Sequence, residues 1–294
     1  MMKKTFSKLL FATLLLCLCA CANDSKTEPM SILAPQGAPA LATLPFADQE
    51  TVSVDYVSGS DPLSAELIKN DSVYDVIIAP INLGTKLMEK NNTPYRLAAV
   101  ITWGNLYIVG EADYQNGDAF AAFGEAAVPG KILTHYADVK EVTYFSSVQD
   151  VQTQLLSGKA KAGLLAEPAA TATIAKAKEK GKTLTILQNL QEKETVDGQK
   201  GYPQAAIFVK DREKTETVLK NIEQLLNETA SNEEQISAWI EQIGVEQLGI
   251  PNAKIALSTW ERQNLKYVDA NTVKNDIAEF LKLFQIVFHD NMLI

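Results

Sequence analysis

Short apolar runs alternate with helical stripes along most of the chain. Runs in which apolar residues are continuous or alternate with polar ones predict β-strands. The expected strands are residues 30–34, 52–57, 75–79, 97–101, 105–109, 125–128, 142–145, 162–166, 184–187 and 204–209. Between several of them apolar residues recur at helical spacing, as in residues 147–156. Strands that alternate with helices indicate parallel sheets covered by helices, so the expected fold class is α/β.

The last third of the chain has a different pattern. After Lys210 the apolar positions follow helical spacing almost to the end, and one stripe runs from Val218 to Leu226. Residues 269–288 predict a closing amphipathic helix that packs against the first part of the chain. We therefore expect this region to be almost entirely helical.

The first 21 residues have the layout of a secretion signal. A short basic region precedes an apolar run at residues 9–18, which is too short for a transmembrane helix of about 20 residues. The following Leu18-Cys19-Ala20-Cys21 resembles the bacterial lipobox. We expect residues 1–20 to be removed as a signal peptide, Cys21 to be lipidated, and residues 21–29 to form a tether. An ordinary signal peptide that contains cysteine is the alternative.

Charge and cysteine content exclude several kinds of protein. All three cysteines lie within residues 17–21, so the folded part has no disulfide, cysteine zinc site or thiol nucleophile. Loss of Lys3, Lys4 and Lys8 with the signal reduces 27 basic residues to 24, against 36 acidic residues, a net charge of −12. Nucleic acid, whose phosphates need a basic face, is therefore not an expected partner. The acyl chains would be the only attachment to the membrane.

Catalytic motifs are not found. The two histidines, His135 and His289, stand in no metal-ligand pattern, and neither a G-x-S-x-G nor a G-x-G-x-x-G motif occurs. Residues 124–132 resemble a phosphate loop, but five residues separate Gly124 from Gly130 where four are needed. We expect no enzymatic activity, no cofactor and no metal site.

Six short segments, in this order, resemble the type II periplasmic binding proteins, in particular the group that serves nitrate, sulfonate, taurine and thiamine-pyrimidine importers. The segments are LAPQGAPA (33–40), DVIIAP (75–80), TWGN (102–105), AEPA (166–169), YPQ (202–204) and NLKYV (264–268). The resemblance covers nearly the whole mature chain.

This resemblance implies two lobes, each a mostly parallel sheet flanked by helices. Residues 30–108 and 207–294 would form lobe 1, and residues 109–206 would form lobe 2. The strands 106–110 and 205–209 would be the hinge. The implied role is that of a monomer that closes on a small solute and delivers it to the permease subunits of an ABC importer. A surface lipoprotein that acts as an adhesin or scaffold is the alternative, and it predicts no closure on a ligand.

Several residues near expected strand ends are candidates for solute contacts. In open parallel sheets, ligands bind beyond the carboxyl ends of strands, often at helix N-termini. Gln36, Gly37 and Ala38 follow the first strand, and Pro80 and Asn82 follow the third. A plain loop is the alternative for the first group, and an N-cap of the following helix is the alternative for Asn82.

Five further candidates lie just before the hinge strands or within lobe 2. Trp103 either stacks on the solute or belongs to the core. Glu167 either accepts hydrogen bonds from an amine or stabilises a helix start. Tyr202 precedes a hinge strand, and Gly130 and Lys131 begin a helix whose amides would face the cleft, as in the family.

The sequence indicates the chemical class of the solute only in part. None of the three arginines lies on an expected cleft loop, so a bidentate clamp for sulfonate or phosphate is not evident. Trp103, Tyr202 and Glu167 together favour a planar, amine-bearing solute such as a pyrimidine. A sulfonate, nitrate or other small anion, held by lysine and backbone amides, is the alternative.

Changing Cys21 to Ala should remove the acceptor for the lipid and release the protein from the membrane fraction. Cell fractionation followed by immunoblotting measures this directly. A variant that stays with the membrane would contradict the lipid anchor.

Overall fold

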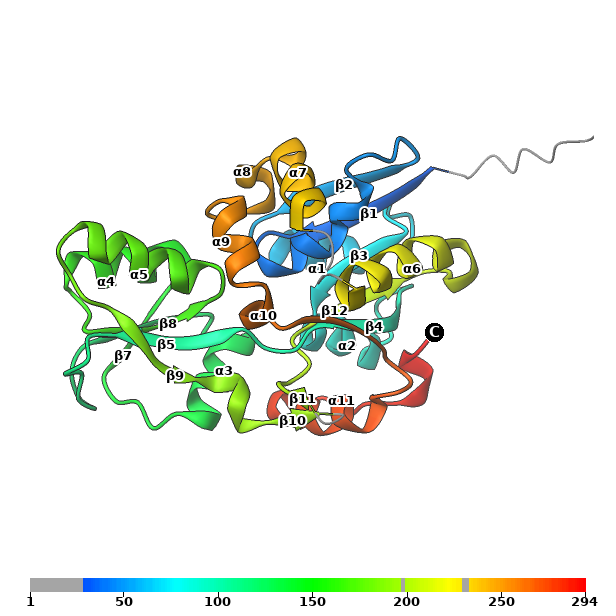
Figure 1. The fold of residues 1–294 in the computed structure, drawn as a ribbon. Helices are drawn as coiled ribbons and strands as arrows, with labels where there is room; N and C mark the ends of the chain where they lie inside the picture. Colours follow the sequence, from blue (N-terminus) through cyan, green and yellow to red (C-terminus); the bar gives the residue numbers. More distant parts are fainter. Residues whose placement is uncertain (1–28, 197–198, 229–232) are drawn as a thin grey trace, which may run out of the picture.

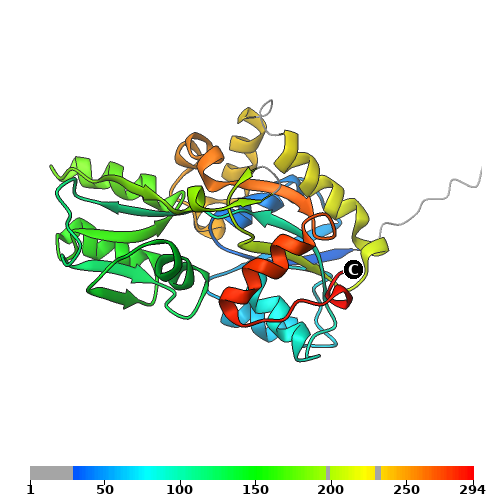
Figure 2. The ribbon, with the colours of Figure 1, turned by 90° about the horizontal axis from the view of Figure 1, so that it is seen from below.

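Two β-sheets, each flanked by helices, form two lobes that lie side by side in both views of the molecule (Figures 1 and 2). The computed structural model describes residues 29–196, 199–228 and 233–294. The expected signal peptide, Cys21 and nearly all of the tether lie outside the described residues. No helix in the described part of the chain is long and apolar enough to cross a membrane.

The first lobe is built on a six-stranded sheet with the order β13-β4-β12-β3-β1-β2. Its strands are β1 (Met30–Pro35), β2 (Val52–Val57), β3 (Val76–Pro80), β4 (Arg96–Thr102), β12 (Ala205–Val209) and β13 (Leu265–Asp269). Strands β1, β2 and β3 pair in parallel, and β12 pairs antiparallel with both β3 and β4. Strand β4 therefore points in the same direction as β3.

Helices cover both faces of this sheet. They are η1 (Ala38–Phe46), α1 (Asp61–Leu67), α2 (Ile81–Glu89), α6 (Arg212–Glu228), α7 (Glu233–Ile243), α8 (Val245–Leu248), α9 (Ala253–Ser258), α10 (Trp260–Gln263), α11 (Lys274–Leu281), η4 (Lys282–Phe284) and η5 (Asp290–Met292). Ile32 of β1 packs in the cluster with η1, α6 and α7, whereas its neighbour Leu33 packs in the cluster with α1, α2 and α11. Burial on both faces explains why the inner strands β3, β4 and β12 are almost continuously apolar.

The second lobe has a five-stranded sheet with the order β7-β6-β8-β5-β9. Its elements are β5 (Leu106–Gly110), β6 (Phe120–Phe123), α3 (Val128–Tyr136), β7 (Val142–Phe145), α4 (Val148–Ser157), β8 (Ala162–Ala166), α5 (Ala169–Glu179), β9 (Thr185–Asn189) and η2 (Leu190–Lys193). A small hairpin, β10 (Thr195–Val196) and β11 (Gln199–Lys200), follows η2. Helices α4 and α5 cover one face of the sheet and α3 covers the other.

Three expectations about the elements were wrong. Residues 125–128 are not a strand, because Gly124 ends β6 in the left-handed region and Pro129 lies in the first turn of α3. The region after Lys210 is not almost entirely helical, because β13 adds an edge strand whose Leu265 and Tyr267 turn into the core. The closing helix also ends at Leu281, well before Phe288.

The chain passes between the sheets in two short segments. We call residues 103–105 the first crossing and residues 201–204 the second crossing. The strands 106–110 and 205–209, expected as hinge strands, each lie within one sheet: β5 pairs with β8 and β9, and β12 pairs with β3 and β4. The links between the lobes are therefore the segments that precede these two strands.

The two crossings are bonded to each other along their backbones. The amide of Tyr202 donates to the carbonyl of Trp103 (3.2 Å), and the amide of Gln204 donates to the carbonyl of Thr102 (2.9 Å). Gly104 has φ +84°, and a Cβ there would lie 2.7 Å from the ring of Tyr202. Glycine at this position permits both the backbone conformation and the close contact.

Changing Gly104 to Ala should lower the free energy of unfolding by about 2 to 4 kcal/mol, because it adds a positive-φ penalty to a steric clash with Tyr202. The matched control is Gly181→Ala, since Gly181 has φ +73° and nothing within 4 Å of its added Cβ. Gly181→Ala should lower the free energy of unfolding by only about 1 kcal/mol. Urea denaturation of both variants measures the difference, and equal losses would show that contact with Tyr202 does not matter.

Candidate solute-binding site

The carboxyl ends of the parallel strands of both sheets meet at the junction between the lobes. Pro80 of β3 and Thr102 of β4 both pair with Ala205, at the start of β12. In the second sheet, Ala166 at the end of β8 pairs with Leu106 at the start of β5. The loops that follow these strands are therefore gathered around the two crossings. This is the edge from which the sequence predicts solute contacts.

The loop after β1 is already occupied by another part of the chain. The side-chain amide of Gln36 donates to the carbonyls of Glu246 (3.0 Å) and Gln247 (3.2 Å). The backbone amide of Gly37 donates to the carbonyl of Leu248 (2.8 Å), and Ala38 is buried at the start of η1. Helix α8 thus takes the hydrogen-bond donors of Gln36 and Gly37.

Asn82 does not cap the helix that it begins. Helix α2 starts at Ile81 with Pro80 at the N-cap position, and no side chain caps it. The Oδ1 atom of Asn82 is buried without a hydrogen-bond partner. Buried polar atoms almost always have partners, so this oxygen is an exception, and Asn82 remains a candidate for a solute contact.

Other unpartnered oxygens lie at the same edge. Besides the oxygen of Asn82, Oγ1 of Thr102 at the end of β4 and Oε1 of Gln204 in the second crossing are buried without partners. The amide nitrogen of Gln204 donates to Oδ1 of Asn105 (3.0 Å), whose own Nδ2 donates to the carbonyl of Glu167 (3.1 Å). The junction is thus rich in uncharged acceptors. Asn105 and Gln204 stand inside the segments TWGN and YPQ, but the sequence did not single them out.

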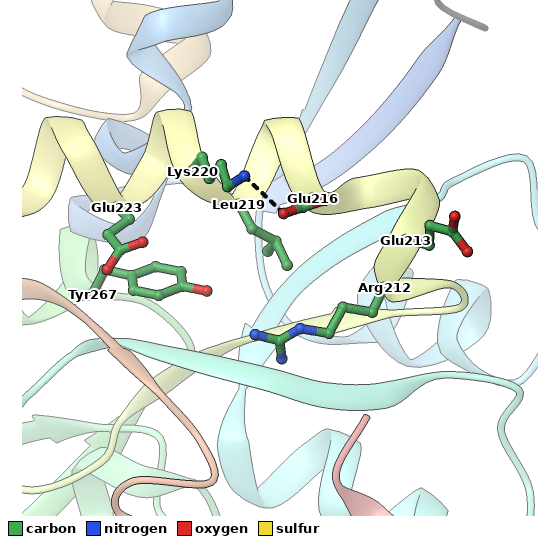
Figure 3. A pocket seen from close by; sticks show the side chains of 7 residues that line it. All are labelled: Arg212, Glu213, Glu216, Leu219, Lys220, Glu223 and Tyr267. Atoms are coloured by element: carbon green, nitrogen blue, oxygen red, sulfur yellow. Dashed lines mark ion pairs between the residues drawn. The ribbon is translucent and has the colours of Figure 1, made fainter.

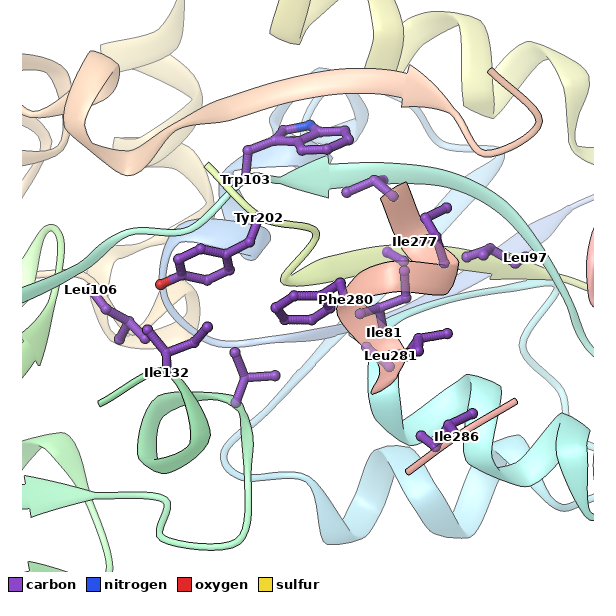
Figure 4. Close-up of a cluster of buried hydrophobic side chains, with 14 of the residues drawn as sticks. Ile81, Leu97, Trp103, Leu106, Ile132, Tyr202, Ile277, Phe280, Leu281 and Ile286 are labelled. Atoms are coloured by element: carbon purple, nitrogen blue, oxygen red, sulfur yellow. The ribbon is translucent and has the colours of Figure 1, made fainter. Parts of the chain in front are cut away.

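Trp103 belongs to the core. Its side chain is 3% exposed, and its Nε1 donates to the carbonyl of Lys266 (3.0 Å) in β13. Figure 4 shows the indole lying along β4 and β13 among other buried side chains. The core alternative therefore describes Trp103 in this structure.

Glu167 joins the two lobes. Its side chain is fully buried, and its oxygens accept hydrogen bonds from Arg262 Nε (2.9 Å), Thr171 Oγ1 (2.7 Å) and the Thr171 amide (3.0 Å). Arg262 belongs to α10 of the first lobe, whereas Thr171 lies in α5 of the second. Trp103 and Glu167 were both expected to contact an amine-bearing solute, but each is bonded to other residues of the chain.

Gly130 and Lys131 serve the turn before α3. The amide of Gly130 donates to the carbonyl of Gly124 (3.0 Å), and the amide of Lys131 donates to the carbonyl of Ala127 (3.1 Å). A Cβ on Gly130 would lie 2.4 Å from the carbonyl oxygen of Glu125. These two amides are therefore used within the chain, and glycine permits the close approach of the turn.

Tyr202 lines a cavity of about 250 Å³ between α3 and α11. Its ring stacks on that of Phe280, with centroids 5.6 Å apart and planes 7° apart. On the other side the ring of Tyr136 lies 6.3 Å away at 26°. Figure 4 shows Tyr202 in the same buried cluster as Phe280 of the first lobe and Ile132 of the second. The sequence did not identify Tyr136 or Phe280 as candidates for solute contacts.

The two tyrosines of this cavity are neutral. Burial and the nearby Glu194 carboxylate raise the pKa of Tyr136 well above its usual range. Burial raises the pKa of Tyr202 in the same direction. The hydroxyl of Tyr136 is therefore a hydrogen-bond donor at neutral pH, and it donates to Oε1 of Glu194.

A second cavity, of about 410 Å³, lies away from the junction, on the surface formed by α6 and β13 (Figure 3). Arg212 lines it and pairs with Asp269 (2.5 Å). Arg96 donates to the carbonyls of Thr93 and Tyr95, and Arg262 is paired with Glu167. Each arginine is thus bonded to other parts of the chain. Among the residues described here, no three His, Cys, Asp or Glu side chains form a group that could hold a metal ion.

Comparisons with known proteins agree with this architecture. No family model matches the chain, and a search of curated proteins finds no similar sequence. Among solved structures, an ABC transporter protein from Parabacteroides distasonis is 22% identical, with a TM-score of 0.73 over 87% of this chain and 92% of that one. The ligand-binding component of an ABC-type import system from Staphylococcus aureus, with zinc bound, is 10% identical, with a TM-score of 0.63 over 91% and 96%.

The periplasmic aliphatic sulphonate-binding protein SsuA of Escherichia coli is 13% identical, with a TM-score of 0.62 over 88% and 87% of the two chains. At these identities the likeness concerns the fold. The chain has the two-lobed α/β fold of the periplasmic binding proteins of ABC importers.

Proposed function

We propose that this protein is the extracytoplasmic solute-binding component of an ABC importer, which captures a small solute between its lobes and presents it to the permease. One observation carries the proposal: two sheets, joined by two short crossings, turn the carboxyl ends of their strands toward each other. Ligands of open α/β sheets bind at such ends. The similar structures are components of the same kind of transport system.

The same proposal includes a lipid anchor at Cys21. The basic start, the apolar run and Leu18-Cys19-Ala20-Cys21 support it. An anchored, monomeric binding protein would remain beside its permease on the outer face of the cell membrane.

The proposed solute carries hydrogen-bond donors. The junction offers unpartnered oxygens of Asn82, Thr102 and Gln204, and its arginine is already paired with Glu167. A planar, amine-bearing compound such as a pyrimidine fits these acceptors better than a sulfonate, which favours a bidentate guanidinium. A small anion held by lysine or backbone amides is the second candidate.

Contacts between the lobes contribute to the balance between open and closed forms, which a solute would shift. The Glu167–Arg262 pair, the bond from the Tyr107 hydroxyl to the carbonyl of Arg262 (2.9 Å) and the bond from Gln204 to Asn105 all form across the junction. A solute that binds only between closed lobes shifts the molecule toward the closed form by its differential affinity.

Small molecules released by denaturing the purified protein should include its solute, identified by mass spectrometry. Added back at about 100 times its dissociation constant, this compound should stabilise the protein by roughly 2.7 kcal/mol. Small-angle scattering should show a smaller radius of gyration. A tight ligand that leaves the radius unchanged would contradict closure, and the absence of any ligand would favour an adhesin or scaffold.

Changing Arg262 to Ala should lower the free energy of unfolding, because it removes one of the three donors to the buried Glu167 carboxylate. A double-mutant cycle with Glu167→Gln should give a coupling of about 1 to 2 kcal/mol, less than for a fully buried pair because Arg262 is partly exposed.

The control is the same cycle for the exposed Lys274–Asp290 pair, Lys274→Ala with Asp290→Asn, which should couple by about 0.5 kcal/mol or less. In each cycle, chemical denaturation measures the free energy of unfolding of the parent protein, the two single variants and the double variant. Equal coupling in the two cycles would mean that the Glu167–Arg262 pair behaves as an ordinary surface pair.

A further inference from the structure

The cavity between α3 and α11 is built by both lobes and by the second crossing. Tyr136 comes from α3 of the second lobe, Tyr202 comes from the second crossing, and Asp276 and Phe280 come from α11 of the first lobe. Its volume of about 250 Å³ lies below the roughly 300 to 1,000 Å³ of sites for drug-sized ligands. A compound that fills it is therefore small and touches both lobes at once.

Aromatic rings form one wall of the cavity. Tyr136, Tyr202 and Phe280 form a continuous stack, with centroid separations of 6.3 and 5.6 Å. His135 meets the edge of this stack, with its ring centroid 4.6 Å from that of Tyr136. Ring faces attract cations and flat apolar groups.

The charged residues around the cavity are mostly acidic. Glu194, Asp276 and Glu279 line it, and the lining lysine, Lys282, is paired with Glu279. The three acidic side chains and Lys282 together carry a formal charge of −2. Glu194 accepts one hydrogen bond from Tyr136, which leaves acceptor sites on its carboxylate for a ligand. Within the described part of the chain, Asp276 forms no ion pair.

We propose that this cavity binds a small organic cation, an ammonium group joined to a flat apolar ring, with the ammonium at Glu194 and the ring against the aromatic stack. The inference rests on the proposed function, because it names the class of solute that the lobes close upon. The net negative charge of the lining disfavours an anion of the same size at this cavity. Since both lobes contribute to the cavity, occupation of the site favours closure.

Three probes of matching size separate charge from shape: 2-phenylethylamine, 2-phenylethanol and phenylacetate, which are cationic, neutral and anionic at neutral pH. Titration calorimetry on the full-length protein should show the amine binding at least tenfold more tightly than the alcohol, and phenylacetate binding most weakly. Equal binding of amine and alcohol, preference for phenylacetate, or binding of none of the three would overturn the proposal.

Glu194→Gln removes the charge but keeps the size and an oxygen that accepts from Tyr136. This change should weaken the binding of the amine at least tenfold and leave the affinity for the alcohol unchanged. The matched control is Glu192→Gln, because Glu192 lies two residues earlier, is exposed and does not line the cavity. It should bind the amine as the parent protein does, and an equal loss in both variants would assign the preference to overall charge.

Scattering separates failure of this inference from failure of the proposed function. If a solute released from the protein compacts the lobes but Glu194→Gln does not affect its binding, the cation site is wrong and solute capture stands. If the amine binds through Glu194 and no compound compacts the lobes, the cation site stands and capture by closure is wrong. A melting curve for each variant shows whether it is folded.

Discussion

The backbone contact between the two crossings fixes how the lobes are placed. Two hydrogen bonds join residues 102–103 to residues 202–204, and Gly104 and Gly201 permit an approach that a side chain would block. A Cβ on Gly201 would lie 2.0 Å from the carbonyl oxygen of Trp103. Strand β4 ends at these bonds and β12 begins there. The strand ends of both sheets therefore meet around them. Tyr202 is held against Gly104 on one side and faces the cavity on the other.

This placement divides the polar groups of the junction into two kinds. Some bond across it, as Glu167 does with Arg262 and Asn105 does with Gln204, and they hold the lobes together without a solute. Others, such as the oxygens of Asn82 and Thr102, are buried without partners. An unsatisfied buried acceptor costs about 1 to 3 kcal/mol. A bound donor that satisfied such groups would therefore add to the contacts that already favour closure.

The local pattern of apolar and polar residues predicted most of the fold. It failed where the structure of a segment depends on contacts with residues far away in the sequence. Continuous apolar runs identified β1, β3 and β8 because both faces of those strands are buried. Strand β13 was missed because its pattern is short and its strand character depends on pairing with β4, more than 160 residues earlier in the chain. The roles of Trp103 and Glu167 were left open or misjudged for the same reason. Their partners, Lys266 and Arg262, lie 163 and 95 residues away in sequence.

The surroundings of two carboxylates, Glu167 and Glu194, show why a residue at a strand end need not be free to bind a solute. Glu167 stands at the expected place, but three donors surround its buried oxygens and leave little room for another. Glu194 follows η2, where no strand-end rule points, and it is half-buried beside a neutral tyrosine hydroxyl. The loop amides of Gly37 and Gly130 are likewise bonded within the chain. Where internal partners already hold the groups near strand ends, as at Glu167, Gly37 and Gly130, the proposed cation site depends instead on residues that flank the second crossing.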